Sequence, residues 1–401
     1  MKQSADVRWD IEARQIEHVK MTLVDLFCGC GGFSLGAHNA GFDVAVAFDN
    51  DATLTSSFAQ NFPRTRLHLR DVSKLRGGQI RKLAKRQITG IFGGPPCQGF
   101  SDIGRRDVSD PRRQLLGHFF RIVSEIRPAF FVMENVRGLA YADARSVLDA
   151  AIEQVADRYH ILGPTILDAA DYGAATRRRR LFVIGIDKDV GDPLELDDIR
   201  AFEKPAATVR SAISDLFCAA SLEAKDDEFD YWRITRRGRP FEYARLLRSD
   251  DGQFTSHRKV EHKAEVAQRF ASVQPGKMDT IGRHPRLAWE SQCPTLRAGT
   301  GADKGSRQAV RPLHPEEPRV ITVREAARLQ GFPDKHLFHP TIWHSFRMIG
   351  NSVSPIVAEA VFRAIREKLD LIAEMGDRRG MSHGRSSTRS LQSDIGVHEM
   401  R

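Results

Sequence analysis

The sequence predicts an α/β fold: a mostly parallel sheet with helices on both faces, joined to a smaller, irregular second domain. Short apolar segments alternate with helical patterns from Thr22 to about Asp187, as in sheets whose parallel strands are connected by helices. The alternation is lost from about Val190 to Arg319, where glycine, proline and charge clusters are frequent. The chain has 401 residues, which is long for one core and suits two domains of unequal size.

The expected strands of the first domain end at residues that could do chemistry. The apolar runs predict strands at Thr22–Phe27, Val44–Phe48, Ile88–Phe92, Ala129–Met133 and Leu181–Ile186, with a helix at Asp143–Ala156 among the connections. Ligands of such sheets bind at the carboxyl ends of the strands. The residues that follow these strands are therefore the first candidates for a functional site.

Regular structure is expected again near the end of the chain. Thr322 and Glu325 have the spacing of a capping box, in which each side chain bonds the backbone of the other. Ser354-Pro355 is a good start for a final helix. That helix carries an apolar stripe that should pack on the first domain, formed by Val357, Val361, Ile365 and Leu369. Residues 376–401 are expected to be a disordered tail, and residues 1–20 an N-terminal extension.

Composition excludes some functions and leaves others open. No apolar run approaches the roughly 18 residues needed to span a bilayer. The charged stretch 1–20 is unlike a secretory signal, so we expect an intracellular protein whose five cysteines are free thiols. The net charge of +9 favours a phosphate-rich partner. From the charge alone, a protein that binds nucleic acid and one that does not are about equally possible.

A glycine-rich turn follows the first expected strand, over Asp25–Gly32. Glycines there allow a sharp turn and a close approach of the backbone to a ligand. Asp49, at the end of the next strand, could accept hydrogen bonds from the two hydroxyls of a ribose. The alternatives are a plain tight turn and an ordinary polar turn over residues 48–51.

The segment Gly93–Ser101 is more informative. Two glycines, two prolines and Cys97 at the end of a strand predict a stiff loop that exposes a thiol. The alternative is a buried, inert cysteine, which is the usual state of a free thiol. That alternative suits the other four cysteines, Cys28, Cys30, Cys218 and Cys293. Cys28 and Cys30 have no second pair at zinc spacing, so we expect no metal site.

Charged residues at two further strand ends complete the set. Glu134 follows the strand Ala129–Met133, where burial should raise the pKa of its carboxyl and suit it to hold a proton. Arg178 and Arg180 precede the strand Leu181–Ile186 and, if the chain enters the strand with alternating side chains, should face the same way, towards one anionic or carbonyl-bearing group. The alternatives are a surface acid at the start of a loop and a solvated basic run.

In order and spacing, these pieces resemble the bacterial 5-cytosine DNA methyltransferases, the modification enzymes of restriction systems. The resemblance covers roughly Met21–Asp187 and Arg311–Ile365. It depends on the strings DLFCGCGGFSLG, GGPPCQGFS, ENVRG, RVITVREAARLQGFP and GNSVSP. It implies a Rossmann-like methyltransferase domain over residues 21–190, completed by residues 345–372, and a target-recognition domain over residues 191–344.

The resemblance also implies a cofactor site and catalytic roles. S-adenosylmethionine should bind without a metal, with Phe27 beside its adenine, Asp49 at the ribose and Asp71 at the adenine amino group. The full implied pocket is Phe27, Gly29, Gly31, Asp49, Asn50, Asp71, Val72, Pro96, Leu115 and Asn351. The implied catalytic residues are the nucleophile Cys97, Glu134 at N3 and the amino group of cytosine, Arg180 at O2 and Arg178 in support.

The implied substrate is a cytosine flipped out of a specific double-stranded DNA sequence. The implied DNA contacts are Gln98, Ser101 and Arg113 around a closing loop, and Arg297 and Lys304 in the second domain. We expect a monomer in the bacterial cytoplasm, associated with the nucleoid, and the sequence leaves open whether it is functionally paired with a separate restriction endonuclease or is a solitary enzyme.

Two other functions remain open from the sequence. One is a tRNA cytosine-5 methyltransferase, and the other is a DNA-binding regulator without catalysis. The chain also departs from the family pattern at two positions: Thr176 stands where glutamine is usual, and Cys293 where serine or alanine is commoner. We expect the first departure to affect the packing of the local loop more than activity.

Overall fold

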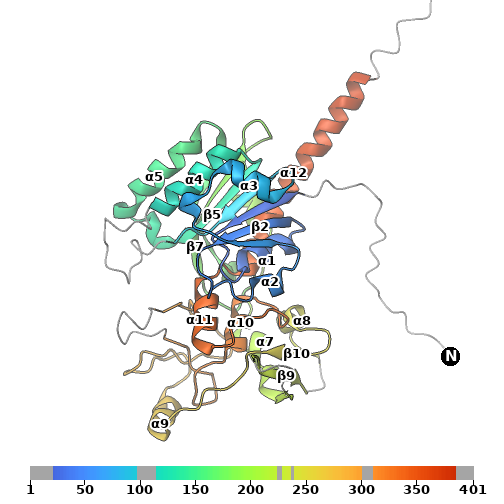
Figure 1. The fold of residues 1–401 in the computed structure, drawn as a ribbon. Helices are drawn as coiled ribbons and strands as arrows, with labels where there is room; N and C mark the ends of the chain where they lie inside the picture. Colours follow the sequence, from blue (N-terminus) through green and yellow to red (C-terminus); the bar gives the residue numbers. More distant parts are fainter. Residues whose placement is uncertain (1–20, 97–113, 224–227, 236–238, 300–309, 385–401) are drawn as a thin grey trace, which may run out of the picture.

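The computed structural model describes residues 21–96, 114–223, 228–235, 239–299 and 310–384, with the backbone alone for residues 142–143 and 372–384. A seven-stranded sheet forms the centre of the upper half of the molecule (Figure 1). Its order is β3-β2-β1-β4-β5-β7-β6. The strands are β1 (Thr22–Leu26), β2 (Asp43–Asp49), β3 (Arg66–Leu69), β4 (Gly90–Gly93), β5 (Phe130–Val136), β6 (Tyr159–Asp168) and β7 (Arg179–Asp187).

The sheet is parallel from β3 to β5, and β7 runs antiparallel to both of its neighbours. Every residue of β1 and of β4 is buried, as expected of central strands covered on both faces. The sequence does not predict β3 or β6. The short β3 is half polar, and β6 contains Gly163-Pro164 at a shift in its register, so neither strand shows the alternation that predicts a strand.

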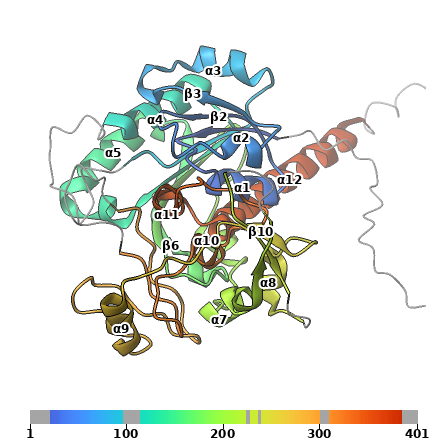
Figure 2. The same cartoon turned by 60° about the horizontal axis from the view of Figure 1, so that its bottom comes forward.

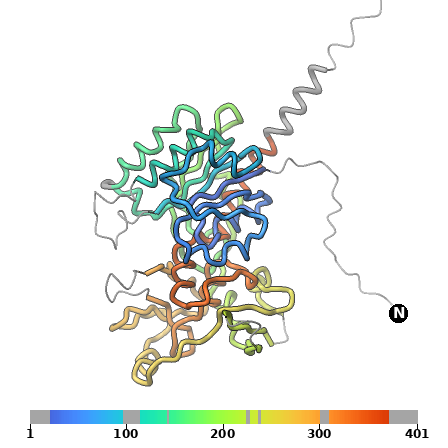
Figure 3. The backbone as a smooth tube through the Cα atoms, in the orientation of Figure 1, coloured from blue at the N-terminus to red at the C-terminus, as the bar shows by residue number. Residues whose placement is uncertain are grey.

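Helices cover both faces of this sheet (Figure 2). One face carries α3 (Gly77–Ala84), α4 (Gln114–Ile126) and α5 (Ala142–Ala156). The other carries α1 (Gly32–Asn39) and the first turns of α12 (Pro355–Gly384), which lie side by side although they are far apart in the sequence (Figure 3). The two helices approach closely because Gly36 has no side chain: a Cβ there would lie 2.4 Å from the Cβ of Ala358.

The start of the final helix and its apolar stripe are confirmed. The stripe of Val357, Val361, Ile365 and Leu369 is buried in the same core cluster as residues of β1, β4 and β5. Helix α12 continues to Gly384, so it includes the first residues of the expected tail, and the disorder expected over residues 376–401 stays a prediction. Residues 1–20 and 385–401 lie outside the described residues.

The second half of the molecule has little regular structure. It contains the antiparallel sheet β10-β9-β8, with β8 (Ala219–Ser221), β9 (Tyr231–Ile234) and β10 (Gln253–Thr255). The helices of this half are α7 (Val209–Ile213), α8 (Glu242–Leu247), α9 (Ala264–Ser272), α10 (Val323–Gln330) and α11 (Ile342–Asn351). Shorter elements are α2 (Phe58–Asn61) and α6 (Leu196–Arg200) in the first half, and one-turn helices such as η1 (Val72–Lys74) and η3 (Arg137–Ala140).

Helix α10 organises this second half from within. Its capping box is confirmed, since the Thr322 hydroxyl accepts from the Glu325 N–H and the Glu325 carboxylate accepts from the Thr322 N–H. All eight of its residues are buried. Buried arginines are stable there because they are paired: Arg319 makes two bonds to Glu325, and Arg328 makes two of 2.7 Å each to Asp334.

Candidate active site

The carboxyl ends of the parallel strands meet at one edge of the sheet and bring the predicted residues together. The N–H groups of Phe27 and Cys28, after β1, donate to the carbonyl of Phe48 at the end of β2 (2.9 and 3.0 Å). After β4, a Cβ on Gly94 would lie 2.9 Å from Oε2 of Glu134 on β5. The two loops that carry the strongest motifs therefore lie against the ends of neighbouring strands.

The glycine-rich turn after β1 has a left-handed backbone at several positions. Phe27, Gly29 and Gly31 have φ of 70°, 50° and 87°. A Cβ on Gly29 would meet nothing within 4 Å, so this part of the turn faces open space. A Cβ on Gly31 would lie 2.2 Å from the Phe62 ring. The close approach that requires glycine at Gly31 is therefore to the protein's own core.

Asp49 ties the end of β2 to this turn. Its two carboxylate oxygens accept from the N–H groups of Gly29 and Asp51, both at 2.9 Å. Burial raises the pKa of the Asp49 carboxyl, and these backbone hydrogen bonds oppose the shift. Each oxygen keeps a second lone pair, so the carboxylate can still accept from a ligand. Asn50, next to it, is exposed.

The segment after β3 lies beside Asp49. The N–H of Arg70 donates to the Asp49 carbonyl at 2.8 Å. The Asp71 carboxylate accepts from the N–H of Ser73. Hydrogen bonding from the Ser73 side chain, and then from its backbone, lowers the pKa of Asp71. Val72 is buried beneath it. The end of β3, which the sequence did not predict, thus places Asp71 at the same edge as Asp49.

Three other predicted pocket residues come from distant parts of the chain. Pro96 and Leu115 are half-buried, and Asn351 is exposed at the end of α11. The end of α11 abuts the start of α1, because a Cβ on Gly32 would lie 2.0 Å from the Ser352 hydroxyl oxygen. Asn351 is therefore held next to the glycine-rich turn.

Glu134 forms a buried ion pair. Its side chain is 9% exposed, and its Oε1 lies 2.9 Å from Nε of Arg180. In the antiparallel register Arg180 pairs with Val136, so Glu134 and Arg180 are diagonal neighbours on one face. Burial raises the pKa of the Glu134 carboxyl, while Arg180 and Arg178 oppose this. The carboxyl can therefore hold a proton at a higher pH than an exposed glutamate.

Arg178 is held differently from Arg180. It is 1% exposed, and its two terminal nitrogens donate to the carbonyls of Leu296 (3.1 Å) and Gly350 (2.7 Å). The two arginines both influence Glu134 but do not share one hydrogen-bonded group. Nε of Arg178 is buried with no hydrogen-bond partner in the described part of the chain.

Thr176 and Cys293, the two residues that depart from the family pattern, contact each other. The hydroxyl of Thr176 and the N–H of Arg177 both donate to the Cys293 carbonyl (3.0 and 2.9 Å). The Cys293 N–H donates to the carbonyl of Ala175 at 2.8 Å. This seam joins the sheet domain to the irregular half immediately before Arg178.

Asn135 is a further residue of the site that the sequence did not predict. Its amide donates to the carbonyl of Pro95 at 3.0 Å, which ties the loop after β4 to β5. Asn135 is buried and lies next to Glu134 in the string ENVRG, so a polar residue one position beyond a strand-end acid was the available signal.

Several predicted residues lie outside the described residues: Cys97, Gln98, Ser101, Arg113 and Lys304. Arg297 is exposed, and its backbone packs on Gly350, where a Cβ would lie 2.5 Å from the Arg297 carbonyl carbon. Cys28, Cys30 and Cys293 are buried, and burial raises the pKa of Cys30 and of Cys293 to about 12. These thiols are therefore poor nucleophiles at neutral pH.

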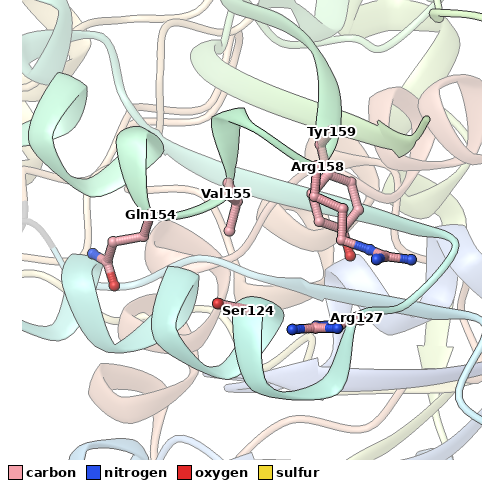
Figure 4. Close-up of a pocket in the computed structure, with 6 residues that line it drawn as sticks. All are labelled: Ser124, Arg127, Gln154, Val155, Arg158 and Tyr159. Atoms are coloured by element: carbon pink, nitrogen blue, oxygen red, sulfur yellow. The ribbon is translucent and has the colours of Figure 1, made fainter. Parts of the chain in front are cut away.

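A small hollow of about 200 Å³ lies away from these groups (Figure 4). It is lined by Ser124, Arg127, Gln154, Val155, Arg158 and Tyr159. The Tyr159 hydroxyl donates to the carbonyl of Pro128, ahead of the first residue of β5. The hollow is therefore at the opposite edge of the sheet from Glu134. Within the described ranges, no cluster of His, Cys, Asp and Glu could hold a metal ion, and no helix could span a membrane.

Comparison with known proteins decides the family. The family model described as C-5 cytosine-specific DNA methylase matches residues 21–367. The chain belongs to this family. The methylase is 39% identical over 377 residues to the Type II methyltransferase M.XorII of Xanthomonas oryzae pv. oryzae, covering 88% of this chain and 87% of that relative. It is 29% identical over 417 residues to M.DdeI of Desulfomicrobium norvegicum, covering 94% and 98%.

Solved structures agree with this assignment. A prophage-encoded protein of Escherichia coli, assigned as a DNA modification methyltransferase, is 39% identical, with a TM-score of 0.72 over 87% of this chain and 99% of that one. The Dnmt2 methyltransferase of S. pombe shares the fold alone, at 17% identity and a TM-score of 0.57. The methylase thus transfers a methyl group from S-adenosylmethionine to cytosine in DNA.

The sheet edge fits S-adenosylmethionine. An adenosyl group needs an apolar slot for the base and acceptors for its hydroxyls. Half-buried Phe27 and Leu115, the carboxylates of Asp49 and Asp71, and the open side of Gly29 provide these features. Directly below, on β1, Oδ1 of Asp25 is buried with no partner within the described part of the chain, although Ser34 donates to its Oδ2.

Proposed function

We propose that the methylase acts on a cytosine flipped out of a specific double-stranded DNA sequence, through a covalent bond between Cys97 and C6. The observation that carries the proposal is the buried pair of Glu134 and Arg180, 2.9 Å apart, beside the loop that leads to Cys97. A carboxyl that can hold a proton next to a guanidinium is complementary to N3 and O2 of cytosine.

The residues of the chain carry the following steps. The Cys97 thiolate adds to C6, and Glu134 gives a proton to N3, so that the electron pair displaced from the ring is available at C5. Arg180 donates to O2, and the buried Arg178 adds positive charge that favours the thiolate. C5 takes the methyl group, a base removes the C5 proton, the bond from sulfur to C6 breaks to restore the ring and the thiolate, and N3 returns its proton to Glu134.

S-adenosylmethionine, when bound, supplies the methyl group on a sulfonium that needs no metal activation, and S-adenosylhomocysteine is the product. Phe27, Asp49, Asp71, Pro96 and Leu115 would hold the adenosine. Gly29, Gly31, Asn50, Val72 and Asn351 would complete the pocket. This assignment of the pocket is supported because those of its residues that the structure describes lie at one edge of the sheet.

The remaining features of the proposal concern the substrate and partners. Residues 191–344 would read the DNA sequence, with Arg297 and Lys304 among the contacts, while Gln98, Ser101 and Arg113 would act around the closing loop. Flipping costs about a few kcal/mol, which these contacts would offset. We expect a monomer acting on the bacterial nucleoid in the cytoplasm, with a separate restriction endonuclease as its functional partner.

Bisulfite sequencing tests the proposal. The chain is expressed in a methylation-free bacterial host, and DNA from that host is compared with DNA from cells expressing Cys97→Ser. Protected cytosines within one short repeated sequence, absent with the variant, are expected. No protected cytosine despite folded protein would contradict the proposal, and methyl incorporation into tRNA would then favour an RNA substrate.

A further inference from the structure

A hairpin projects from the irregular half of the molecule, directly after α9. We call residues Gly276–Arg286 the arm. Its two strands are joined by backbone bonds between Gly276 and Arg286 (2.9 Å), Arg286 and Lys277 (2.7 Å), and Asp279 and His284 (2.9 Å). Met278 and Pro285 form the antiparallel bridge between them. The arm is thus an ordered structure that lies outside the named strands.

The base of the arm is fixed by a buried arginine. Arg286 is 7% exposed, and burial lowers the pKa of its guanidinium. All of its nitrogens donate to backbone carbonyls, those of Phe270 (2.7 Å), Val273 (3.2 Å), Pro315 (3.0 Å) and Glu316 (2.7 Å). Four such bonds to a cation hold the arm in one direction relative to α9.

The tip of the arm is also fixed. Asp279 is 1% exposed, its Oδ2 accepts from the N–H of Gly282 at 2.5 Å, and its Oδ1 lies 3.1 Å from Nε of Arg269 on α9. Arg283 has a left-handed backbone, with φ of 58°, which is unfavourable for a residue with a side chain. A tip held in this way is arranged before any partner binds, so binding costs less ordering entropy.

The fixed tip presents apolar side chains between cations. Ile281 is 72% exposed and Met278 is 49% exposed. Lys277 and Arg283, on either side of them, are exposed as well. Both cations have no ion-pair partner within the described ranges. Cations bind phosphates, and an apolar side chain between them can pack on the faces or methyl groups of bases.

The arm is continuous with the active site. From its base, residues 287–296 run to the Leu296 carbonyl, which accepts from the buried Arg178. Helix α9, which precedes the arm, lies on the same side of the molecule as α5, the helix that follows Glu134 and η3, in both views (Figures 1 and 2). Helix α8 lies on the other side (Figures 1 and 2).

From these observations we infer that the arm enters the DNA substrate, with Lys277 and Arg283 on phosphates and Ile281 packed against bases. The inference deepens the proposed function, because it names a contact that the irregular half makes with the duplex. A protein partner could also pack against an apolar tip, but it would not require cations on both sides of that tip, so the pattern favours DNA.

The inference that the arm contacts DNA is tested by equilibrium binding of the full-length protein to a fluorescently labelled duplex at several salt concentrations. The double variant Lys277→Gln/Arg283→Gln should reduce the slope of log K against log salt by about 1.8, since each phosphate contact contributes about 0.9. Ile281→Ala should weaken binding about tenfold without changing that slope, as expected for the loss of one packed apolar contact. Unfolding temperatures of all variants are measured alongside.

Two matched controls lie elsewhere on the surface. Lys82→Gln removes an exposed cation from α3, and Leu371→Ala removes a 59% exposed leucine from α12, outside the residues proposed to read DNA. Both should bind as the wild type does. A double variant with an unchanged salt slope, or an Ile281→Ala variant with unchanged affinity for DNA, would contradict the inference that the arm enters the DNA. Methylation of cellular DNA by the wild type is scored separately, so failure of the arm is distinguishable from failure of the proposed function.

Discussion

Replacing Glu134 by glutamine tests the proton-holding role most cleanly. Glutamine has nearly the same size and keeps one oxygen acceptor, but it has no charge and cannot give a proton to N3. The native carboxylate lies 2.9 Å from Nε of Arg180, with side-chain exposures of 9% and 14%. The substitution therefore removes the charge partner of a mostly buried guanidinium while it leaves the packing of β5 nearly unchanged.

The expected loss has two parts. A positioned general acid contributes about 10²–10⁴-fold to a rate. A hydrogen bond to a charged group contributes about 1.5–3 kcal/mol, against about 0.5–1.5 kcal/mol for one to a neutral group, so the weaker bond to glutamine loosens Arg180 at the site where O2 would bind. We expect kcat to fall at least about a hundredfold. KM for S-adenosylmethionine should hold, because Asp49 and Gly29 lie at other strand ends.

The pH dependence gives a second readout. Burial raises the pKa of the Glu134 carboxyl, so its protonated form persists to a higher pH than in an exposed glutamate. If the protonated carboxyl serves N3, the wild-type rate falls as the pH rises through this pKa, and the glutamine variant lacks that part of the profile. The assay is incorporation of labelled methyl groups into DNA over a pH series. A variant with kcat within threefold of wild type, or with the same pH profile, would refute the reasoning.

Three further predictions concern the surroundings of the site. Burial raises the pKa of Asp25 to about 8, so the contribution of this carboxyl to the free energy of unfolding is complete below about pH 4 and falls by about 1.4 kcal/mol per pH unit as the pH rises to 8. The Asp25→Asn variant should lack this dependence when its free energy of unfolding is measured in urea at about pH 5.5 and 7.5. A variant with the same pH dependence as the wild type would contradict the prediction. Asp49→Asn cannot accept at both oxygens, so KM for S-adenosylmethionine should rise about tenfold with kcat retained; an unchanged KM would count against its role. Thr176→Val loses the 3.0 Å bond to the Cys293 carbonyl and should cost about 1 kcal/mol of unfolding free energy without changing kcat, whereas a large fall in kcat would give Thr176 a catalytic role.

Local sequence patterns predicted the central strands well. Runs such as Ile88–Phe92 are buried on both faces, so they show as continuous apolar stretches followed by glycine and proline. The capping box of α10 and the start of α12 are also local, since each depends on residues a few positions apart. These features need no knowledge of distant contacts.

The features that the sequence did not predict depend on partners far along the chain. The bond from Asn135 to Pro95 joins residues 40 positions apart, and that from Thr176 to Cys293 joins residues 117 apart. The buried Arg328 would be expected on the surface, because charged residues are rarely buried unless they are paired. Its carboxylate partners, Asp215 and Asp334, are identified only by the folded structure.

The central claim is that Cys97 bonds to C6 of the target cytosine. The most direct measurement uses a duplex containing the methylated sequence, with 5-fluorocytosine at the target position, incubated with the protein and S-adenosylmethionine. Fluorine replaces the C5 proton that must leave before the bond from sulfur to C6 can break, so the adduct should persist. Mass spectrometry should find DNA attached to the peptide that contains Cys97, and none with Cys97→Ser. Turnover on normal DNA with no trapped adduct, or an adduct at another residue, would contradict the claim.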